Sequence, residues 1–113
     1  MGQNRDKLIG LFIGNLSNAI LHKILANAIK DKEIIQRYDK EIKTSWEISK
    51  EYRAKINPAH DTLPPKDIKD IQRRITSKVR AELSIRISKG YENLDLNLVE
   101  RSVDKALKEM KVV

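Results

Sequence analysis

The sequence predicts an all-α protein, and three features of the 113-residue chain support this fold class. Apolar residues recur at every third or fourth position in four successive segments, which is the period of a helix with one buried side. The aromatic residues are one Trp, three Tyr and one Phe, so aliphatic side chains must form most of the core. Residues 57–65 contain all three prolines and therefore mark a break between helices.

These features predict a single helical domain, residues 1–113, folded as an antiparallel four-helix bundle that self-associates. A chain of this length buries a limited share of its surface, and a second copy would cover more of it. The expected helices span approximately residues 5–30, 31–56, 65–89 and 97–111.

The first segment, residues 5–30, carries apolar side chains over an arc that is wider than one face of a helix. This arc predicts a helix that is buried on two sides. Gly10 and Gly14, followed by Ser17, leave a shallow groove where another backbone can approach closely. Trp46 lies on the apolar stripe of the second segment, a position typical of a core or interface anchor. The predicted self-association interface therefore consists of Gly10, Gly14, Ser17 and Trp46.

The apolar first segment is not expected to enter a membrane, because Asn15, Asn18, His22 and Lys23 interrupt it. No small-residue cleavage site of a signal peptide accompanies it. The absence of cysteine excludes disulfides, thiolate metal sites and thiol catalysis, and it suits a reducing compartment. We therefore expect a cytoplasmic protein. Its richness in Ile, Lys and Glu is also typical of thermophile proteins.

Residues 65–98 allow two interpretations. Pro65 at a first helical position and the isoleucine-rich stripe that follows predict a helix to Lys89, with Gly90 as its left-handed cap. Apolar and polar residues also alternate here, however, which makes a β-hairpin at about 79–98 the alternative. We favour the helix, because this segment contains strong helix formers and an isolated hairpin is only marginally stable.

The last helix is predicted from the residues that would begin it and from its apolar spacing. Asn97 and Glu100 have the spacing of a capping box, in which each side chain bonds to the backbone of the other. Val99, Val103 and Leu107 follow at helical spacing and predict one buried side.

Motifs for catalysis or cofactor binding are absent from the sequence. It contains no Gly-rich phosphate loop, no G-x-S-x-G, no H-E-x-x-H and no Ca²⁺-binding loop. We therefore expect no metal site and no cofactor.

Arg53 and His60 are separated by six residues, and this spacing resembles the R-x(4–6)-H signature of the HEPN family of small, all-helical, dimeric ribonucleases. The resemblance implies that the Arg and His of two protomers meet in a cleft and cut RNA without a metal. The His would act as acid and base, and the Arg would bind phosphate. Arg53 and His60 are the catalytic candidates of this alternative.

Basic residues are concentrated in the third segment, where residues 58–90 contain eight Lys or Arg and four Asp or Glu. On a helical projection, most of these cations share an arc opposite the isoleucine stripe. Such a face can follow the phosphates of a nucleic acid, remain a solvated surface, or bind an acidic protein partner. The candidate nucleic-acid-binding residues are Lys66, Lys69, Arg73, Arg74 and Arg80.

These observations predict a non-enzymatic basic helical protein that binds nucleic acid or forms part of a nucleoprotein assembly. The net charge of +7 favours this interpretation. The first alternative is a helical interaction or assembly subunit without a nucleic-acid role. The second is a small, metal-independent HEPN-like ribonuclease.

Overall fold

The computed structural model describes residues 5–56 and 63–112, and the regular elements in these ranges are four helices without a strand. The predicted all-α fold is therefore confirmed. Helix α1 spans Arg5–Ala28, α2 spans Lys32–Ile56, α3 spans Pro65–Ser88 and α4 spans Leu98–Glu109.

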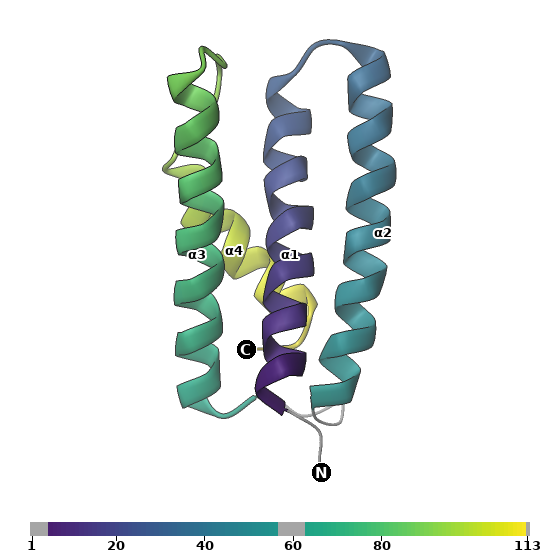
Figure 1. Cartoon of the computed structure of the whole chain (residues 1–113), viewed down its shortest axis with the longest axis vertical. Helices are drawn as coiled ribbons and strands as arrows, with labels where there is room; N and C mark the ends of the chain where they lie inside the picture. The colour runs from purple at the N-terminus through teal and green to yellow at the C-terminus, as the bar shows by residue number, and fades with distance from the viewer. Residues whose placement is uncertain (1–4, 57–62, 113) are drawn as a thin grey trace.

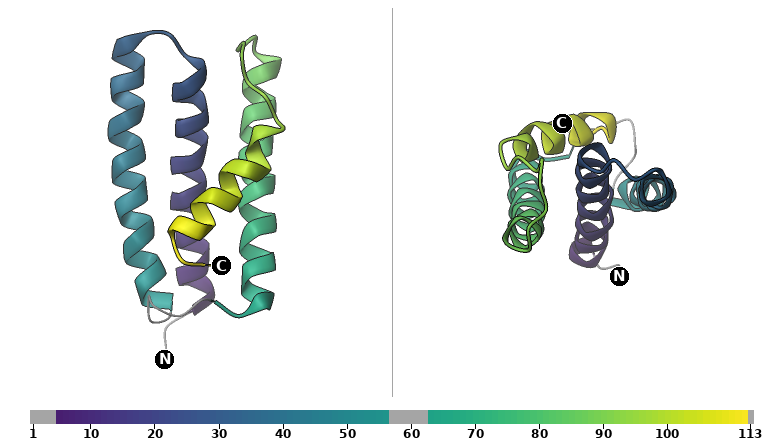
Figure 2. Two further views of the ribbon diagram at one scale, coloured as in Figure 1. Left: turned by 180° about the vertical axis from the view of Figure 1, so that it is seen from behind. Right: turned by 90° about the horizontal axis from the view of Figure 1, so that it is seen from above.

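Three helices stand side by side, and α4 crosses one face of this layer (Figures 1 and 2). α1 is central, because α2, α3 and α4 all pack against it, whereas within the described residues α2 packs against neither α3 nor α4. α1 and α2 are antiparallel. α1 and α3 run in the same direction, because the chain reverses once from α1 to α2 and again from α2 to α3. They are neighbours because α2 lies on the outer side of α1 instead of between them. The order across the layer is thus α2, α1, α3.

The hydrophobic core is built around α1, whose wide apolar arc is covered from three sides by the other helices. Phe12, Leu16 and Leu25 of α1 are fully buried. The core residues of α3 and α4 that are no more than 1% exposed are Ile71, Ile75, Val79, Leu83, Val99, Val103 and Leu107. Packing within the chain accounts for this arc, so its width gives no argument for self-association.

α1 is the one helix in the described ranges that is long and apolar enough to cross a membrane, judged by length and composition alone. Of the apolar window that meets this criterion, 56% is buried inside the protein. The apolar character of α1 is thus explained by its central place in the core.

The alternative of a β-hairpin at about 79–98 is wrong, because α3 continues without interruption to Ser88. Val79 and Leu83, one helical turn apart, are both buried, whereas Ile85 and Ile87 of the same alternating run are 47% and 39% exposed. The alternation therefore does not mark a single buried face.

α3 ends at the predicted glycine. Gly90 has a φ of 98°, in the region that favours glycine. This conformation lets the Tyr91 N–H donate to the Arg86 carbonyl at 3.1 Å and the Gly90 N–H donate to the Ile87 carbonyl at 3.0 Å. Both bonds belong to the Schellman motif, which satisfies carbonyls at the end of a helix.

The predicted capping box at the start of α4 is not formed. Asn97 has helical backbone angles, φ −69° and ψ −16°, and its side chain makes no capping hydrogen bond. A capping side chain requires a non-helical backbone at its own residue, which explains the difference. Asp95 stabilises this turn instead, since its carboxylate accepts a hydrogen bond from the Asn97 N–H at 2.9 Å.

Candidate nucleic-acid interface

The predicted basic residues of α3 occupy its outer side and the edge toward α1. Lys66, Lys69, Arg73 and Arg74 are all exposed. Arg73 and Arg74 line a groove between α1 and α3, and Lys78, which the sequence analysis did not select, lines the same groove. We use the name "basic face" for the set Lys66, Lys69, Arg73, Arg74 and Lys78.

The groove between α1 and α3 consists of three adjoining hollows with volumes of about 770, 690 and 400 Å³. The first two share Arg73 and Arg74, and the last two share Gly14 and Lys78. α3 supplies most of the cations of the groove and α1 supplies Arg5, while Gly10 and Gly14 of α1 line its middle section. The groove is therefore continuous along much of both helices.

Asp70 partly neutralises the basic face. Its carboxylate accepts hydrogen bonds from Arg73 at 2.9 Å and from Arg74 at 3.3 Å. The hydrogen bond from Arg73, helped by the one from Arg74, lowers the pKa of the Asp70 carboxyl below its usual value. A second carboxylate at the groove, Asp67, is paired with Arg5 of α1 at 2.6 Å. Both carboxylates are thus already bound to guanidinium groups.

Three ammonium groups of the basic face remain without such a partner. Lys66, Lys69 and Lys78 form no ion pair with any residue in 5–56 or 63–112. The two larger hollows of the groove therefore hold the five cations of the basic face and Arg5 together with three carboxylates, those of Asp6, Asp67 and Asp70, and this excess of positive charge suits an anionic ligand.

Arg80 is turned away from the groove. Its Nη2 lies 3.1 Å from Oε1 of Glu100 in α4. On the same side of α3, Gln72 donates to the carboxylate of Asp104 in α4 at 2.7 Å. The structure thus separates Arg80 from the other four predicted residues, because its charge is paired across the contact between α3 and α4.

The four residues predicted for self-association lie in three different environments. A Cβ at Gly10 would meet nothing within 4 Å, and one at Gly14 would meet only the Lys78 ammonium, at 3.9 Å. Ser17 is 2% exposed inside the protein and lines the third hollow. The glycines therefore leave room in the groove and do not bring two helices of this chain close together.

Serines of α2 permit the close approach to α1 instead. Ser45 and Ser49 are buried, and Asn18 of α1 donates a hydrogen bond to the Ser45 hydroxyl at 2.9 Å. The Ser49 hydroxyl donates to the Ser45 carbonyl at 2.7 Å, so its polarity is satisfied within α2. The small residues that matter for packing within the chain are thus on the second helix.

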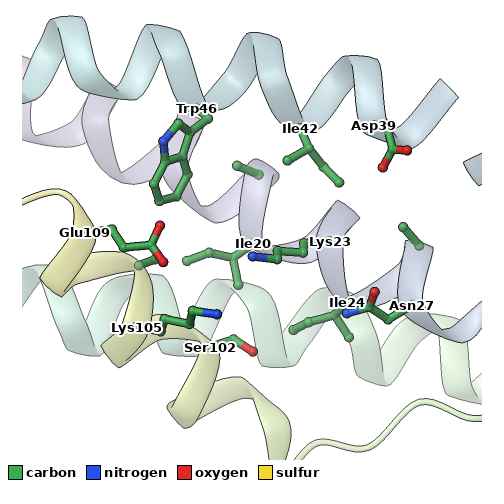
Figure 3. A pocket seen from close by; sticks show the side chains of 13 residues that line it. Ile20, Lys23, Ile24, Asn27, Asp39, Ile42, Trp46, Ser102, Lys105 and Glu109 are labelled. Atoms are coloured by element: carbon green, nitrogen blue, oxygen red, sulfur yellow. The ribbon is translucent and has the colours of Figure 1, made fainter. Parts of the chain in front are cut away.

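Trp46 lies at a separate hollow, outside the groove, with a volume of about 430 Å³ between α1, α2 and α4. Figure 3 shows its indole beside Ile42 of α2, above Ile20 of α1 and near Glu109 of α4. The other polar residues of the lining are Lys23, Asn27, Asp39, Ser102 and Lys105. The hollow exists because α2 and α4 do not pack against each other.

Arg53 is buried and bonded to backbone carbonyls. It is 3% exposed, its Nε donates to the Met110 carbonyl at 3.1 Å, and its Nη2 donates to the Lys111 carbonyl at 2.7 Å. These carbonyls follow the C-terminal end of α4, where a cation is stabilising. The geometry therefore gives Arg53 a role in holding α2 to the end of the chain. His60, its partner in the ribonuclease alternative, lies outside the described residues.

The third hollow of the groove has a polar lining. Ser17 Oγ is buried and has no hydrogen-bond partner within the described residues. His22 stacks on Tyr38, with ring centroids 5.1 Å apart, and its Nδ1 lies 3.2 Å from Glu41 Oε2 without hydrogen-bond geometry. Burial lowers the pKa of His22, Glu41 raises it and Arg86 lowers it further. The net lowering of the His22 pKa favours the neutral imidazole.

Lys78 was not predicted from the sequence, because on a helical projection it lies between the basic arc and the apolar stripe. Its position one helical turn after Arg74 is the feature of the sequence that could have identified it. Within the described ranges, no three His, Asp or Glu side chains lie close enough together to hold a metal ion.

Neither known protein families nor curated proteins nor solved structures show a match to this chain. The function of this protein is therefore inferred from the geometry of its site.

Proposed function

We propose that the protein binds the phosphate backbone of nucleic acid through the basic face of α3. The observation that carries the proposal is the excess of positive charge along the groove: the five cations of the basic face and Arg5 line its two larger hollows together with three carboxylates, those of Asp6, Asp67 and Asp70. Lys66, Lys69 and Lys78 have no ion partner in the described parts of the chain. An anionic ligand would supply the missing counter-charge.

The dimensions of the basic face fit a run of phosphates. From Lys66 to Lys78 a helix rises about 18 Å, at 1.5 Å per residue. Phosphates along one strand of DNA follow each other every 3.4 Å or so along the helix axis, so several of them lie within this length. We expect little sequence preference, because phosphate contacts position a protein without reading bases.

A salt titration of binding tests the proposal. The net excess of three cations along the two larger hollows predicts a slope of roughly −3 in a plot of log affinity against log salt concentration. Fluorescence anisotropy with labelled oligonucleotides measures both quantities. An affinity that does not change with salt would contradict phosphate binding.

A pair of double variants separates this face from the overall charge. Lys66→Gln with Lys69→Gln removes two exposed ammonium groups from the basic face, and the slope is expected to become shallower by about 1.5 to 2. Lys40→Gln with Lys43→Gln removes the same charge from exposed positions of α2 and serves as the matched control. If both double variants weaken binding equally, only net charge matters and the proposed face is wrong.

A second candidate function, that of an assembly subunit, is favoured by the hollow around Trp46. Trp46 and Ile42 are only half-buried there, and the rim carries both cations and carboxylates, which suits contact with a second copy of the chain. This function does not require nucleic acid, and an acidic protein partner on the basic face would be a third. A competition experiment distinguishes nucleic-acid binding from protein binding at the basic face. A single-stranded oligonucleotide is added to the complex with such a protein partner, and displacement of the partner is measured.

We further propose a cytoplasmic location and a thermophile-like stability, on the Cys-free, Lys-rich composition. Fractionation of cells and thermal unfolding of the purified protein test these two statements. Location in an oxidising compartment, or unfolding in the mesophile range of about 45–65 °C, would contradict them.

A further inference from the structure

The third hollow of the groove, about 400 Å³ between α1 and α3, differs in chemistry from the basic face that adjoins it. Its lining combines a hydroxyl and two side-chain amides from α1 with Lys78, Glu82 and Arg86 from α3. The volume lies in the range of small-molecule sites. Hydrogen-bonding groups of both kinds line it, so it is suited to a polar ligand that both donates and accepts.

Ser17 is the group in this hollow that most requires an explanation. Its side chain is 2% exposed, yet its hydroxyl has no hydrogen-bond partner among the described residues. Buried polar groups in native proteins are rarely left unpaired, because the loss of water is not compensated. The other buried serine hydroxyl of comparable exposure, that of Ser49, is bonded to a carbonyl at 2.7 Å. Ser17 is thus an unused donor and acceptor at the wall of the hollow.

The side-chain amides of Asn15 and Asn18, which line the hollow beside Ser17, each have an oxygen that is available as an acceptor. Asn15 donates through Nδ2 to the Leu11 carbonyl at 2.8 Å, and Asn18 donates through Nδ2 to the Ser45 hydroxyl at 2.9 Å. Their amide oxygens make no hydrogen bond within the described residues. Acceptors of this kind disfavour a bare anion and suit a ligand that brings its own N–H groups.

The hollow opens onto the basic face at Lys78. Lys78 and Gly14 line both the third hollow and the middle section of the groove. The ammonium of Lys78 would lie 3.9 Å from a Cβ placed on Gly14, so a side chain larger than alanine at this position would fill the space beside Lys78. Arg86 on the far side is bound to Glu82 at 3.0 Å, which leaves Lys78 as the unpaired cation of the hollow.

We propose that this hollow receives one unpaired nucleobase of a single strand whose phosphates lie on the basic face of α3. The inference rests on the proposed function and adds the class of nucleic acid. Lys78 binds the phosphate next to the inserted nucleotide, and Ser17 with the amide oxygens of Asn15 and Asn18 bonds to the polar edge of the base. A duplex keeps these edges paired inside its stack, whereas a single strand presents them freely.

The first test compares a short single-stranded oligonucleotide with its duplex at one salt concentration. The unmodified protein is expected to bind the single strand more tightly. Ser17→Ala is expected to weaken single-strand binding about three- to tenfold, the range for one lost hydrogen bond, without changing duplex binding. The melting temperature of Ser17→Ala should not fall, because the hydroxyl has no hydrogen-bond partner in residues 5–56 and 63–112. Ser49→Ala is the matched control, since it removes an equally buried hydroxyl outside the hollow and should leave both affinities unchanged.

The second test uses the passage at Gly14. Gly14→Leu fills the passage beside Lys78 and should abolish the preference for the single strand, whereas Gly10→Leu, the same change outside the third hollow, should retain it. Equal affinity of the unmodified protein for both forms, together with no effect of Ser17→Ala, overturns the inference and leaves the salt-dependent phosphate binding standing. Absence of any nucleic-acid binding overturns both.

Discussion

Arg53 illustrates how the surroundings of one residue determine its role. It has the type and the spacing of a phosphate ligand, but its guanidinium is 3% exposed and donates to the carbonyls of Met110 and Lys111. Lys111 itself has a φ of 58°, the left-handed conformation that ends α4. A guanidinium that binds two carbonyls inside the protein is poorly placed to bind a phosphate in a cleft. A basic side chain in solvent, such as that of Lys66 or Arg73, is well placed to do so.

Replacing Arg53 should reveal this structural role. Arg53→Ala is expected to lower the free energy of unfolding by about 2–4 kcal/mol, because two carbonyls at the end of α4 lose a charged donor. Arg101→Ala, at an exposed position of α4, should change it by less than about 0.5 kcal/mol. Urea unfolding measures both. An Arg53→Ala protein of unchanged stability that has lost RNA cleavage would support the ribonuclease alternative instead.

At the scale of elements, α1 combines two tasks on its different sides. Its apolar residues form the centre of the core, and Gly10 and Gly14 line the groove beside the basic face. Glycine weakens the interior of a helix, and here no close backbone contact within the chain compensates for it. The missing side chains of Gly10 and Gly14 make the groove deeper. This depth supports the proposal that the groove is a binding surface.

Two glycine substitutions should have opposite effects on stability. Gly90→Ala is expected to lower the free energy of unfolding by about 1–2 kcal/mol, because its φ of 98° is strained for alanine. Gly10→Ala is expected to raise it by about 0.5–1 kcal/mol, since it lies within a helix and its Cβ would meet no atom within 4 Å. Chemical denaturation of both variants checks the signs. A loss of stability in Gly10→Ala would mean that a second copy packs against this glycine.

At the scale of the whole molecule, the layer of three helices is covered by α4 on one face and only in part (Figure 2). The molecule is elongated, with extents of 45 × 24 × 22 Å and a radius of gyration of 14.5 Å. A compact domain of this length would have a radius of gyration of about 13 Å. Because α2 packs against α1 alone, the hollow around Trp46 remains open to a partner.

The protein is expected to be a dimer or larger at micromolar concentration, with the contact at this hollow. Ile42→Glu should yield a monomer in sedimentation experiments, because a charged side chain that must be desolvated would replace an apolar one at the centre of the contact. Ile34→Glu, at an isoleucine of the same helix that is 38% exposed, should leave the assembly intact. Trp46 is the single tryptophan, so its emission should shift to shorter wavelength as the complex forms. A monomeric mass of the unmodified protein at all concentrations would contradict this prediction.

The positions of the helices can be predicted from the sequence, because helices depend on contacts three and four residues apart and on local signals at their ends. Pro65 begins α3, and Gly90 ends it in the conformation that glycine favours. Lys66, Lys69 and Arg73 are exposed as the helical projection predicts, since each lies opposite the buried stripe of its own helix. All of this information is local to one element.

The site itself depends on which helices become neighbours, and only the tertiary structure shows that. α3 lies beside α1 instead of α2, and this contact creates the groove, brings in Lys78 and leaves Ser17 at its wall. Arg80 is paired with Glu100, 20 residues away, and Arg53 reaches the carbonyl of Met110, 57 residues away. Periodicity along one helix holds no information about such partners, because the free energy of a buried or paired charge is set by groups that the fold brings together.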